Sequence, residues 1–281
     1  MTVKQTLGRA RVILADNSID DASLESELLL RQALGISRVQ LYLDLNLEID
    51  PRQAESFWRL IERRINHEPT AYISGHREFY GLDFHVDPNV LIPRPESELL
   101  VEKALELAQN RTVSTIADVG TGCGAIAISL ALNLPRVKIY AIDISAAALE
   151  VARFNCQKHG VEDGICLLES DMLDSLTEPV DLIIANLPYV KESELSSVGT
   201  LNYEPALALD GGSDGLKKIR QLCSQVGNKL LPGGCLLLEI GCGQSGALIS
   251  FLHRLFPLAK IEVVPDMSGI DRAVNVILLV S

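Results

Sequence analysis

The sequence has no run of lysine or arginine, and its charge balance is acidic. It contains 25 Lys and Arg against 37 Asp and Glu, which gives a formal net charge of −12 at pH 7. Because phosphate backbones repel an acidic surface, this balance disfavours generic binding to nucleic acid. No stretch of the sequence indicates a basic patch that would offset the repulsion.

Metal-binding and disulfide patterns are also missing. The five histidines are scattered, and the six cysteines include no CxxC pair. We therefore expect no metal site. Several cysteines lie in apolar runs, as reduced core thiols do, so a cytoplasmic location fits better than an oxidising compartment. The cysteines are Cys123, Cys156, Cys166, Cys223, Cys235 and Cys242.

Neither a membrane span nor a signal peptide is expected. No apolar run approaches the roughly 20 residues that cross a bilayer. Residues 1–10, MTVKQTLGRA, lack the apolar core of a signal peptide. What the sequence does contain is an ordinary globular composition, with 47% hydrophobic and 22% charged residues. Its 281 residues suffice for one large domain or two smaller ones.

Residues 1–75 are predicted to form a small helical domain. Apolar residues recur at helical spacing in segments 4–16, 22–35 and 51–65, and Pro51 fits the first turn of the last helix. No motif in this domain carries chemistry. We interpret it as a helical bundle that recognises a protein substrate.

A linker and a second domain follow. Residues 76–92, HREFYGLDFHVDPNVLI, place aromatic and β-branched residues on both sides of Gly81, which predicts a β-hairpin. A new helix is expected after the two prolines of segment 92–109. We therefore predict a hairpin linker at 76–92 and a larger domain at 93–281.

In the larger domain, strands and helices alternate from residue 114 onward. Apolar strands separated by helices predict a parallel sheet that is covered on both faces. The predicted strands are 114–120, 137–143, 165–171, 181–187, 235–241, 260–266 and 273–280. The predicted helices between them are 125–133, 146–160, 214–230 and 245–256.

The last strand is expected to run antiparallel. Only about five residues, 267–271, separate it from the strand before, whereas a parallel crossover needs a dozen or more. The predicted fold class is therefore α/β, with a mostly parallel, Rossmann-like sheet of seven strands and an antiparallel last strand. A small α-helical domain and a β-hairpin precede it. This arrangement resembles that of one large group of S-adenosylmethionine-dependent methyltransferases.

A glycine-rich turn follows the first strand of this sheet. In DVGTGCGA, Gly120, Gly122 and Gly124 stand where strand becomes helix, and such glycines let a ligand approach the backbone and the free N–H groups of the helix. The stretch also satisfies the dinucleotide pattern GxGxxG/A. Asp143 ends the next strand, where a carboxylate can accept both hydroxyls of a ribose. S-adenosylmethionine and NAD suit these features equally.

The third strand ends at Asp171 and Met172. Ligands of an open parallel sheet lie beyond the carboxyl ends of its strands, so Asp171 is placed to accept from an adenine amino group and Met172 to pack on the ring. The alternative, that Asp171 caps a short turn, is about as well supported.

The fourth strand runs from apolar residues into Asn186-Leu187-Pro188-Tyr189, which we call the NLPY turn. On this motif alone, a simple turn and a binding site are equally supported. Its place at the carboxyl end of the strand, before a long stretch at 190–213 with few structural signals, favours a site, because long loops are commonly functional.

Four segments carry a resemblance to a known family. N-P-P-Y is the signature of enzymes that methylate an amino or amide nitrogen, and the NLPY turn is similar with one change. Together with segments 68–98, 118–128 and 204–216, it resembles the release-factor glutamine methyltransferases. The helical start also fits the helical N-terminal domain of that family.

The resemblance implies an activity. In that family, S-adenosylmethionine donates a methyl group to the side-chain amide nitrogen, N5, of the glutamine in the Gly-Gly-Gln loop of class 1 peptide chain release factors, and S-adenosylhomocysteine remains. The residues expected to bind the cofactor are Gly120, Thr121, Gly122, Cys123, Gly124, Asp143, Asp171, Met172 and Asn186. The residues expected to bind substrate and support catalysis are Asn186, Leu187, Pro188 and Tyr189.

The chemistry of an amide explains the NLPY turn. An amide nitrogen is a poor nucleophile and carries two N–H donors. We expect the Asn186 side-chain oxygen to accept one and the Leu187 carbonyl the other, which aims the nitrogen and stabilises developing positive charge. Pro188 would restrict the backbone and Tyr189 would pack on the flat amide. No strong general base is required.

Two residues depart from the family pattern. Leu187 stands where the family has proline, but the role of that residue belongs to its carbonyl, so we expect function with a slightly less rigid loop. Ser97 replaces the usual threonine, keeps the hydroxyl, and is assigned no catalytic role. Glu204 and Pro205 are expected to shape substrate access, although Glu204 is equally well interpreted as a solvated loop carboxylate.

Two other functions compete with the leading hypothesis. An adenine amino group also presents two donors beside an aromatic face, so an amino-methyltransferase acting on nucleic acid is the alternative. The acidic charge counts against it. The third candidate is a nicotinamide-binding protein or a non-catalytic nucleotide-binding module, which the glycine turn permits but the NLPY turn does not require.

Overall fold

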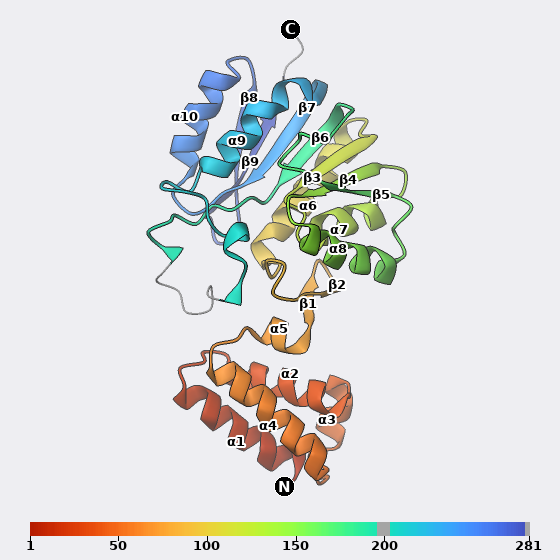
Figure 1. The fold of residues 1–281 in the computed structure, drawn as a ribbon, viewed down its shortest axis with the longest axis vertical. Coiled ribbons are helices and arrows are strands. Elements are labelled where there is room, and N and C mark those ends of the chain that lie inside the picture. The colour runs from red at the N-terminus through yellow and green to blue at the C-terminus, as the bar shows by residue number, and fades with distance from the viewer. Residues whose placement is uncertain (196–202, 279–281) are drawn as a thin grey trace. The chain divides into compact units, whose positions relative to one another are not determined.

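The computed structural model describes residues 1–195 and 203–278. The chain forms two compact units, Met1–His76 and Arg77–Ser281, which we call the helical unit and the sheet unit (Figure 1). The predicted long stretch at 190–213 therefore falls partly outside the described residues, as does the end of the predicted last strand at 279–280.

The helical unit is built mainly from helices, with one isolated β-bridge between Thr2 and Glu48. The helices are α1 (Val3–Asp16), α2 (Ala22–Leu34), α3 (Arg38–Leu43), α4 (Pro51–Ile65) and α5 (Thr70–Ser74). The three long helices confirm the predicted segments, and Pro51 lies in the first turn of α4 as expected. The helices α3 and α5 were not predicted, because six and five residues are too few to show a helical period.

Apolar side chains of α1, α2 and α4 form the core of this unit. Leu14, Leu29 and Phe57 are fully buried there. A buried ionic contact adds to the packing, since Glu25 accepts hydrogen bonds from Arg64 and, at 2.7 Å, from the Thr70 hydroxyl. This carboxylate links α2 to α4 and α5.

The predicted hairpin is present. Its strands are β1 (His76–Phe79) and β2 (Leu82–His85), and the two residues between them, Tyr80 and Gly81, both have positive φ, at 51° and 71°. That conformation matches the twist of a two-residue hairpin. Asn155 in helix α8 (Ala146–His159) is fully buried and bonds to both backbone groups of His85, so the hairpin is fixed to the sheet unit.

Seven strands form the main sheet, in the order β5-β4-β3-β6-β7-β9-β8. The strands are β3 (Thr115–Val119), β4 (Lys138–Asp143), β5 (Ile165–Glu169), β6 (Val180–Ala185), β7 (Leu230–Glu239), β8 (Lys260–Pro265) and β9 (Asp271–Ile277). The first five pair in parallel, and β9 runs antiparallel to both β7 and β8. The predicted fold class, with its antiparallel last strand, is confirmed.

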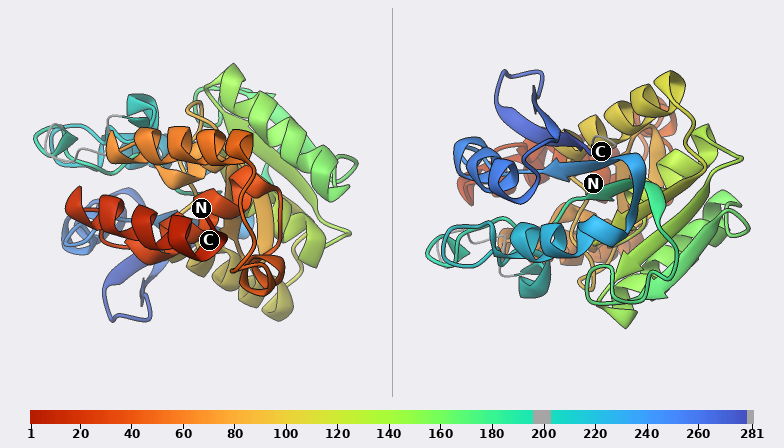
Figure 2. Two further views of the ribbon diagram at one scale, coloured as in Figure 1. Left: turned by 90° about the horizontal axis from the view of Figure 1, so that it is seen from below. Right: turned by 90° about the horizontal axis from the view of Figure 1, so that it is seen from above.

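Helices lie on both faces of this twisted sheet (Figure 2). Besides α8, they are α6 (Glu98–Asn110), α7 (Ala125–Asn133), α9 (Lys217–Gln225) and α10 (Ser245–Leu255). The predicted helix at 214–230 was too long, since its first residues form a turn and its last ones a short 3₁₀ segment at Val226–Asn228. Among the described helices, none has the length and apolar character that crossing a membrane requires.

The sheet order determines where a ligand can bind. Strand β3 lies between β4 and β6 in the sheet. The turn that follows β3 therefore lies between the segment that follows β4 and the segment that follows β6. In open parallel sheets, the crevice outside the carboxyl ends of such strands is the usual ligand site. Here it brings together the glycine turn at 120–124, Asp143 and the NLPY turn.

Candidate active site

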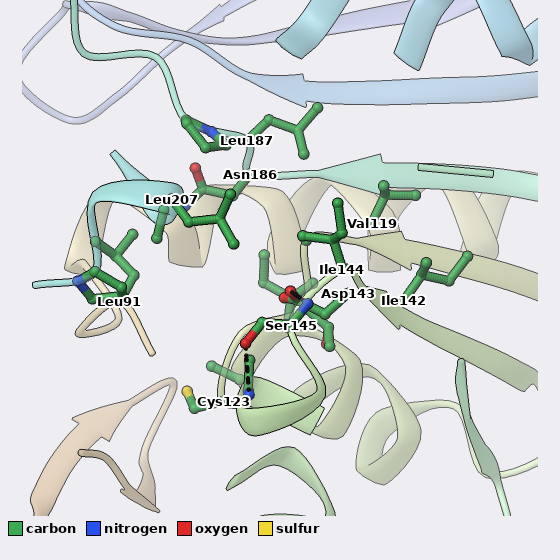
Figure 3. A pocket seen from close by; sticks show the side chains of 18 of the residues that line it. Leu91, Val119, Cys123, Ile142, Asp143, Ile144, Ser145, Asn186, Leu187 and Leu207 are labelled. Carbon is green, nitrogen blue, oxygen red and sulfur yellow. Dashed lines mark hydrogen bonds between the residues drawn. The ribbon is translucent and has the colours of Figure 1, made fainter. Parts of the chain in front are cut away.

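A pocket of about 1080 Å³, including the part open to solvent, lies at the carboxyl ends of β3, β4, β5 and β6 (Figure 3). Most of the predicted site residues line it. Those in its wall are Gly120, Thr121, Cys123, Asp143, Asp171, Met172, Asn186, Leu187 and Pro188. The predicted residues outside the lining are Gly122, Gly124 and Tyr189. Among the described residues, no group of histidine, cysteine, aspartate or glutamate is placed to hold a metal ion.

The glycine turn depends on backbone conformations that favour glycine. Gly120, Gly122 and Gly124 all have positive φ, at 76°, 55° and 84°. A side chain at Gly120 would also be tightly packed, because a Cβ would lie 3.1 Å from Cδ2 of Leu187. The glycine turn and the NLPY turn therefore pack directly against each other.

Asp143 stabilises the glycine turn from the end of β4. Its two oxygens accept hydrogen bonds from the backbone N–H groups of Gly122 and Ser145, each at 2.9 Å. Burial raises the pKa of this carboxyl, while the backbone hydrogen bonds oppose that effect. Each carboxylate oxygen has a second lone pair, so Asp143 still has acceptor capacity for the hydroxyls of a ligand in the pocket.

Asp118, near the end of β3, does not line the pocket but supports Thr121 in its wall, and sequence reasoning missed it. Its Oδ2 accepts from the Thr121 hydroxyl at 2.7 Å, and its Oδ1 is buried without a partner among the described residues. Burial raises the pKa of Asp118 to about 7. The available signal was an acidic residue inside an apolar strand, two positions before the glycine turn.

Asp171 and Met172 lie at the edge of the pocket near β5. The Nε2 of Gln221 donates to both oxygens of Asp171 at 3.0 Å, so this exposed carboxylate already has a partner. Met172 is buried and has a φ of 51°, an uncommon conformation for a residue with a side chain. The predicted contacts of these two residues with adenine stay predictions.

The NLPY turn directly follows β6, and Asn186 lies on a different wall of the pocket from Asp143 (Figure 3). The Nδ2 of Asn186 donates to the hydroxyl of the buried Ser97 at 2.8 Å. Because the amide nitrogen is directed at Ser97, the amide oxygen points away from it. Asn186 thus offers a fixed acceptor for an N–H donor.

Tyr189 does not line the pocket and has polar partners of its own. Its hydroxyl donates to Oε1 of Glu239 at 3.1 Å, and its carbonyl accepts from Nε2 of Gln244 at 2.9 Å. The ring packs against Gly241, where a Cβ would lie 3.2 Å from the Tyr189 Cδ2. The predicted contact between this ring and a substrate amide stays a prediction.

A second glycine-rich loop packs on the backbone of the NLPY turn. Gly211 donates to the carbonyl of Val190 at 2.8 Å. At Gly215, where φ is +76°, a Cβ would lie only 2.3 Å from the Tyr189 carbonyl oxygen and 2.2 Å from Nε2 of Gln244. The glycines of the DGGSDG segment therefore allow this close approach.

Glu204 is not a solvated loop carboxylate. It is 6% exposed, accepts from the backbone N–H of Ile92 at 3.1 Å and pairs with Arg94. Glu204 thereby connects residues 92–94, which precede Ser97, to the loop after the NLPY turn. The next residue, Pro205, lines the pocket.

Sequence comparisons agree with the two-unit organisation. A family model described as "PrmC N-terminal domain" matches residues 5–75, and one described as "Methyltransferase small domain" matches residues 95–201. The release factor glutamine methyltransferase of Moorella thermoacetica is 43% identical over 274 residues, which cover 97% of each chain. The protein of the same name from Geobacter sulfurreducens is 37% identical, covering 98% of this chain and 96% of that relative.

Solved structures share the fold of the sheet unit at lower identity. A methyltransferase from Pyrococcus furiosus has a TM-score of 0.54 at 19% identity and covers 72% of this chain and 91% of its own. The ribosomal protein L11 methylase of Lactobacillus delbrueckii subsp. bulgaricus has a TM-score of 0.50 at 21% identity and covers 68% and 82%. At these identities the likeness concerns the fold alone.

Proposed function

The chain belongs to the release factor glutamine methyltransferases, and we propose that it methylates the side-chain amide nitrogen of the glutamine in the Gly-Gly-Gln loop of peptide chain release factors. The observation that carries this proposal is Asn186, whose amide nitrogen is bound to Ser97 while its oxygen is left to accept from a substrate N–H. The cytoplasm, where these substrates act, is the proposed location.

The pocket fits S-adenosylmethionine as the methyl donor. Gly120 keeps the wall free of a side chain, and Asp143 has acceptor capacity for ribose hydroxyls. Thr121, Cys123 and Met172 complete the wall that would hold the nucleoside. When bound, this cofactor supplies a methyl group that is already activated by the sulfonium.

The protein then has to position the amide and stabilise its charge. We assign the Asn186 Oδ1 and the Leu187 carbonyl to the two hydrogens of the substrate amide, which aims the nitrogen and favours loss of its planarity. Pro188 keeps Leu187 extended, because the α-helical conformation is disfavoured before a proline. The extra proton of the methylated amide is lost to water, so no strong base is required.

A transfer assay tests the proposal. The full-length protein is incubated with S-adenosylmethionine labelled in the methyl group and with a purified release factor, a variant in which the glutamine of the Gly-Gly-Gln loop is alanine, DNA, or RNA. We expect label on the unmodified release factor, located at that glutamine by mass spectrometry, and none on the alanine variant. Label on DNA or RNA without label on the release factor would support the alternative, an adenine amino-methyltransferase.

A further inference from the structure

Glu239 is a buried carboxylate next to the proposed active site. It ends strand β7 with 1% of its surface exposed and does not line the pocket. Burial raises the pKa of this carboxyl, and interactions with Ser97, Tyr189 and Arg272 oppose that effect. Leaving such a group in the core is costly, so its retention calls for an explanation.

Glu239 is connected to both ends of the NLPY turn. Its Oε1 accepts from the Tyr189 hydroxyl at 3.1 Å. The interaction with Ser97 lowers the pKa of the same carboxyl. Ser97 in turn accepts from Nδ2 of Asn186 at 2.8 Å. Glu239 thus interacts directly with Tyr189 and, through Ser97, with Asn186, and these two residues are only three positions apart in the turn.

The hydrogen-bonding roles of Asn186, Ser97 and Glu239 depend on one another. A serine hydroxyl has one hydrogen, and a carboxylate only accepts. The Ser97 oxygen accepts from Asn186, so its own hydrogen is available, and the Glu239 Oε2 is buried without a partner among the described residues. If Ser97 donates to that oxygen, it can only accept from Asn186.

We propose that Glu239 is a positioning residue for methyl transfer. It takes the Ser97 hydrogen and so fixes the Asn186 amide with its nitrogen toward Ser97 and its oxygen toward the substrate. If the Asn186 amide were flipped, its N–H groups would face the N–H of the substrate, and the acceptor oxygen would be turned away. This inference rests on the proposed function only in that the acceptor molecule is an amide or amine.

The decisive variant is Glu239→Gln, which keeps the shape but adds a donor. The glutamine N–H₂ can donate to Ser97, whose hydrogen then becomes available to the Asn186 oxygen and allows the amide to flip. We expect kcat to fall about 10- to 100-fold, with the cofactor Kd and the substrate KM within about threefold of wild type. The matched control is Asp181→Asn, a partly buried carboxylate that accepts from the backbone N–H groups of Ser114 and Thr115 near the start of β6, far from the pocket, and this variant should leave kcat unchanged.

A second set of variants keeps the proposal testable if Glu239→Gln folds poorly. Ser97→Ala should lower kcat to a similar extent, and Ser97→Thr, which retains a hydroxyl, should restore most of that loss. The double variant Ser97→Ala/Glu239→Gln should have a kcat no lower than that of the slower single variant, because both changes interrupt the same series of hydrogen bonds.

Some results would overturn the positioning role. These are an unchanged kcat in Glu239→Gln, losses that multiply in the double variant, or a rise in KM or cofactor Kd that accounts for the whole effect. The assays use whichever acceptor the wild-type enzyme methylates. A wild type that methylates nucleic acid instead would refute the proposed function, while the same kcat comparison would still decide the role of Glu239.

Discussion

The glycine turn and the NLPY turn form two walls of one pocket, yet they are held in different ways. The glycine turn is fixed by nearby partners, since Thr121 bonds to Asp118 three positions away and Gly122 to Asp143 twenty-one positions away. The NLPY turn is fixed by remote partners, with Asn186 bonded to Ser97 at a separation of 89 residues and Tyr189 to Glu239 at 50. The wall proposed to bind the cofactor is thus built by two adjacent strands, whereas the wall proposed to bind the substrate depends on Ser97, just before α6, and on Glu239 at the end of β7.

Replacing the central acceptor of the NLPY turn should have the largest effect on activity. In Asn186→Ala, we expect kcat to fall about 10²- to 10³-fold, because the acceptor that stabilises charge on the substrate nitrogen is lost. The cofactor Kd, measured by calorimetry, should change by less than about threefold, because the glycine turn keeps its own hydrogen bonds. Wild-type turnover in this variant would show that Asn186 is not the acceptor.

A glycine substitution tests how tightly the remote partners hold the turn. Gly215→Ala places a Cβ against the Tyr189 carbonyl and should lower the free energy of unfolding by about 3 kcal/mol, combining strained φ with overpacking. Gly243→Ala is the matched control, because its φ is +78° and a Cβ there meets nothing within 4 Å, so only about 1 kcal/mol is expected. Equal losses in urea denaturation would mean that the contact at Gly215 relaxes freely.

The cofactor wall can be weakened separately. Asp143→Ala removes the acceptor for the ribose and the partner of two backbone N–H groups, so the cofactor Kd should rise about 10- to 100-fold. At saturating cofactor, kcat should remain within about fivefold of wild type, because the NLPY turn is held by other residues. Unchanged cofactor binding would reject the assignment of Asp143.

The smallest predicted effect concerns Asp118 and pH. Its pKa is raised to about 7 in the folded protein from an ordinary value of 3.8, so the folded state keeps a proton that the unfolded state loses. The stability that this proton contributes is present below about pH 4 and is lost as pH rises through about 7. Between pH 6 and pH 8 the free energy of unfolding should fall by about 1 kcal/mol more in wild type than in Asp118→Asn. Parallel pH profiles of the two proteins would contradict this.

The contrast between the two walls also explains what the sequence could predict. Strands such as 114–120, the hairpin at Gly81 and the glycine turn are specified by local period, turn residues and short-range hydrogen bonds. The partners of the NLPY turn are not specified by such local signals. Nothing in the NLPY turn indicates that Ser97, 89 positions earlier, accepts a hydrogen bond from Asn186. The partner of the Tyr189 hydroxyl escaped prediction for the same reason, since Glu239 lies in a different strand.

Leu187 gives the NLPY turn a temperature dependence that a proline would not give. A proline ring restricts φ through covalent bonds and lowers the conformational entropy of the chain at any temperature. Leu187 is instead held by burial, being 4% exposed and packed against Gly120. Burial of a leucine contributes about 1.5–3 kcal/mol, and this contribution weakens on cooling. The part of the order of the NLPY turn that comes from Leu187 therefore weakens on cooling, whereas the restriction imposed by a proline ring would not.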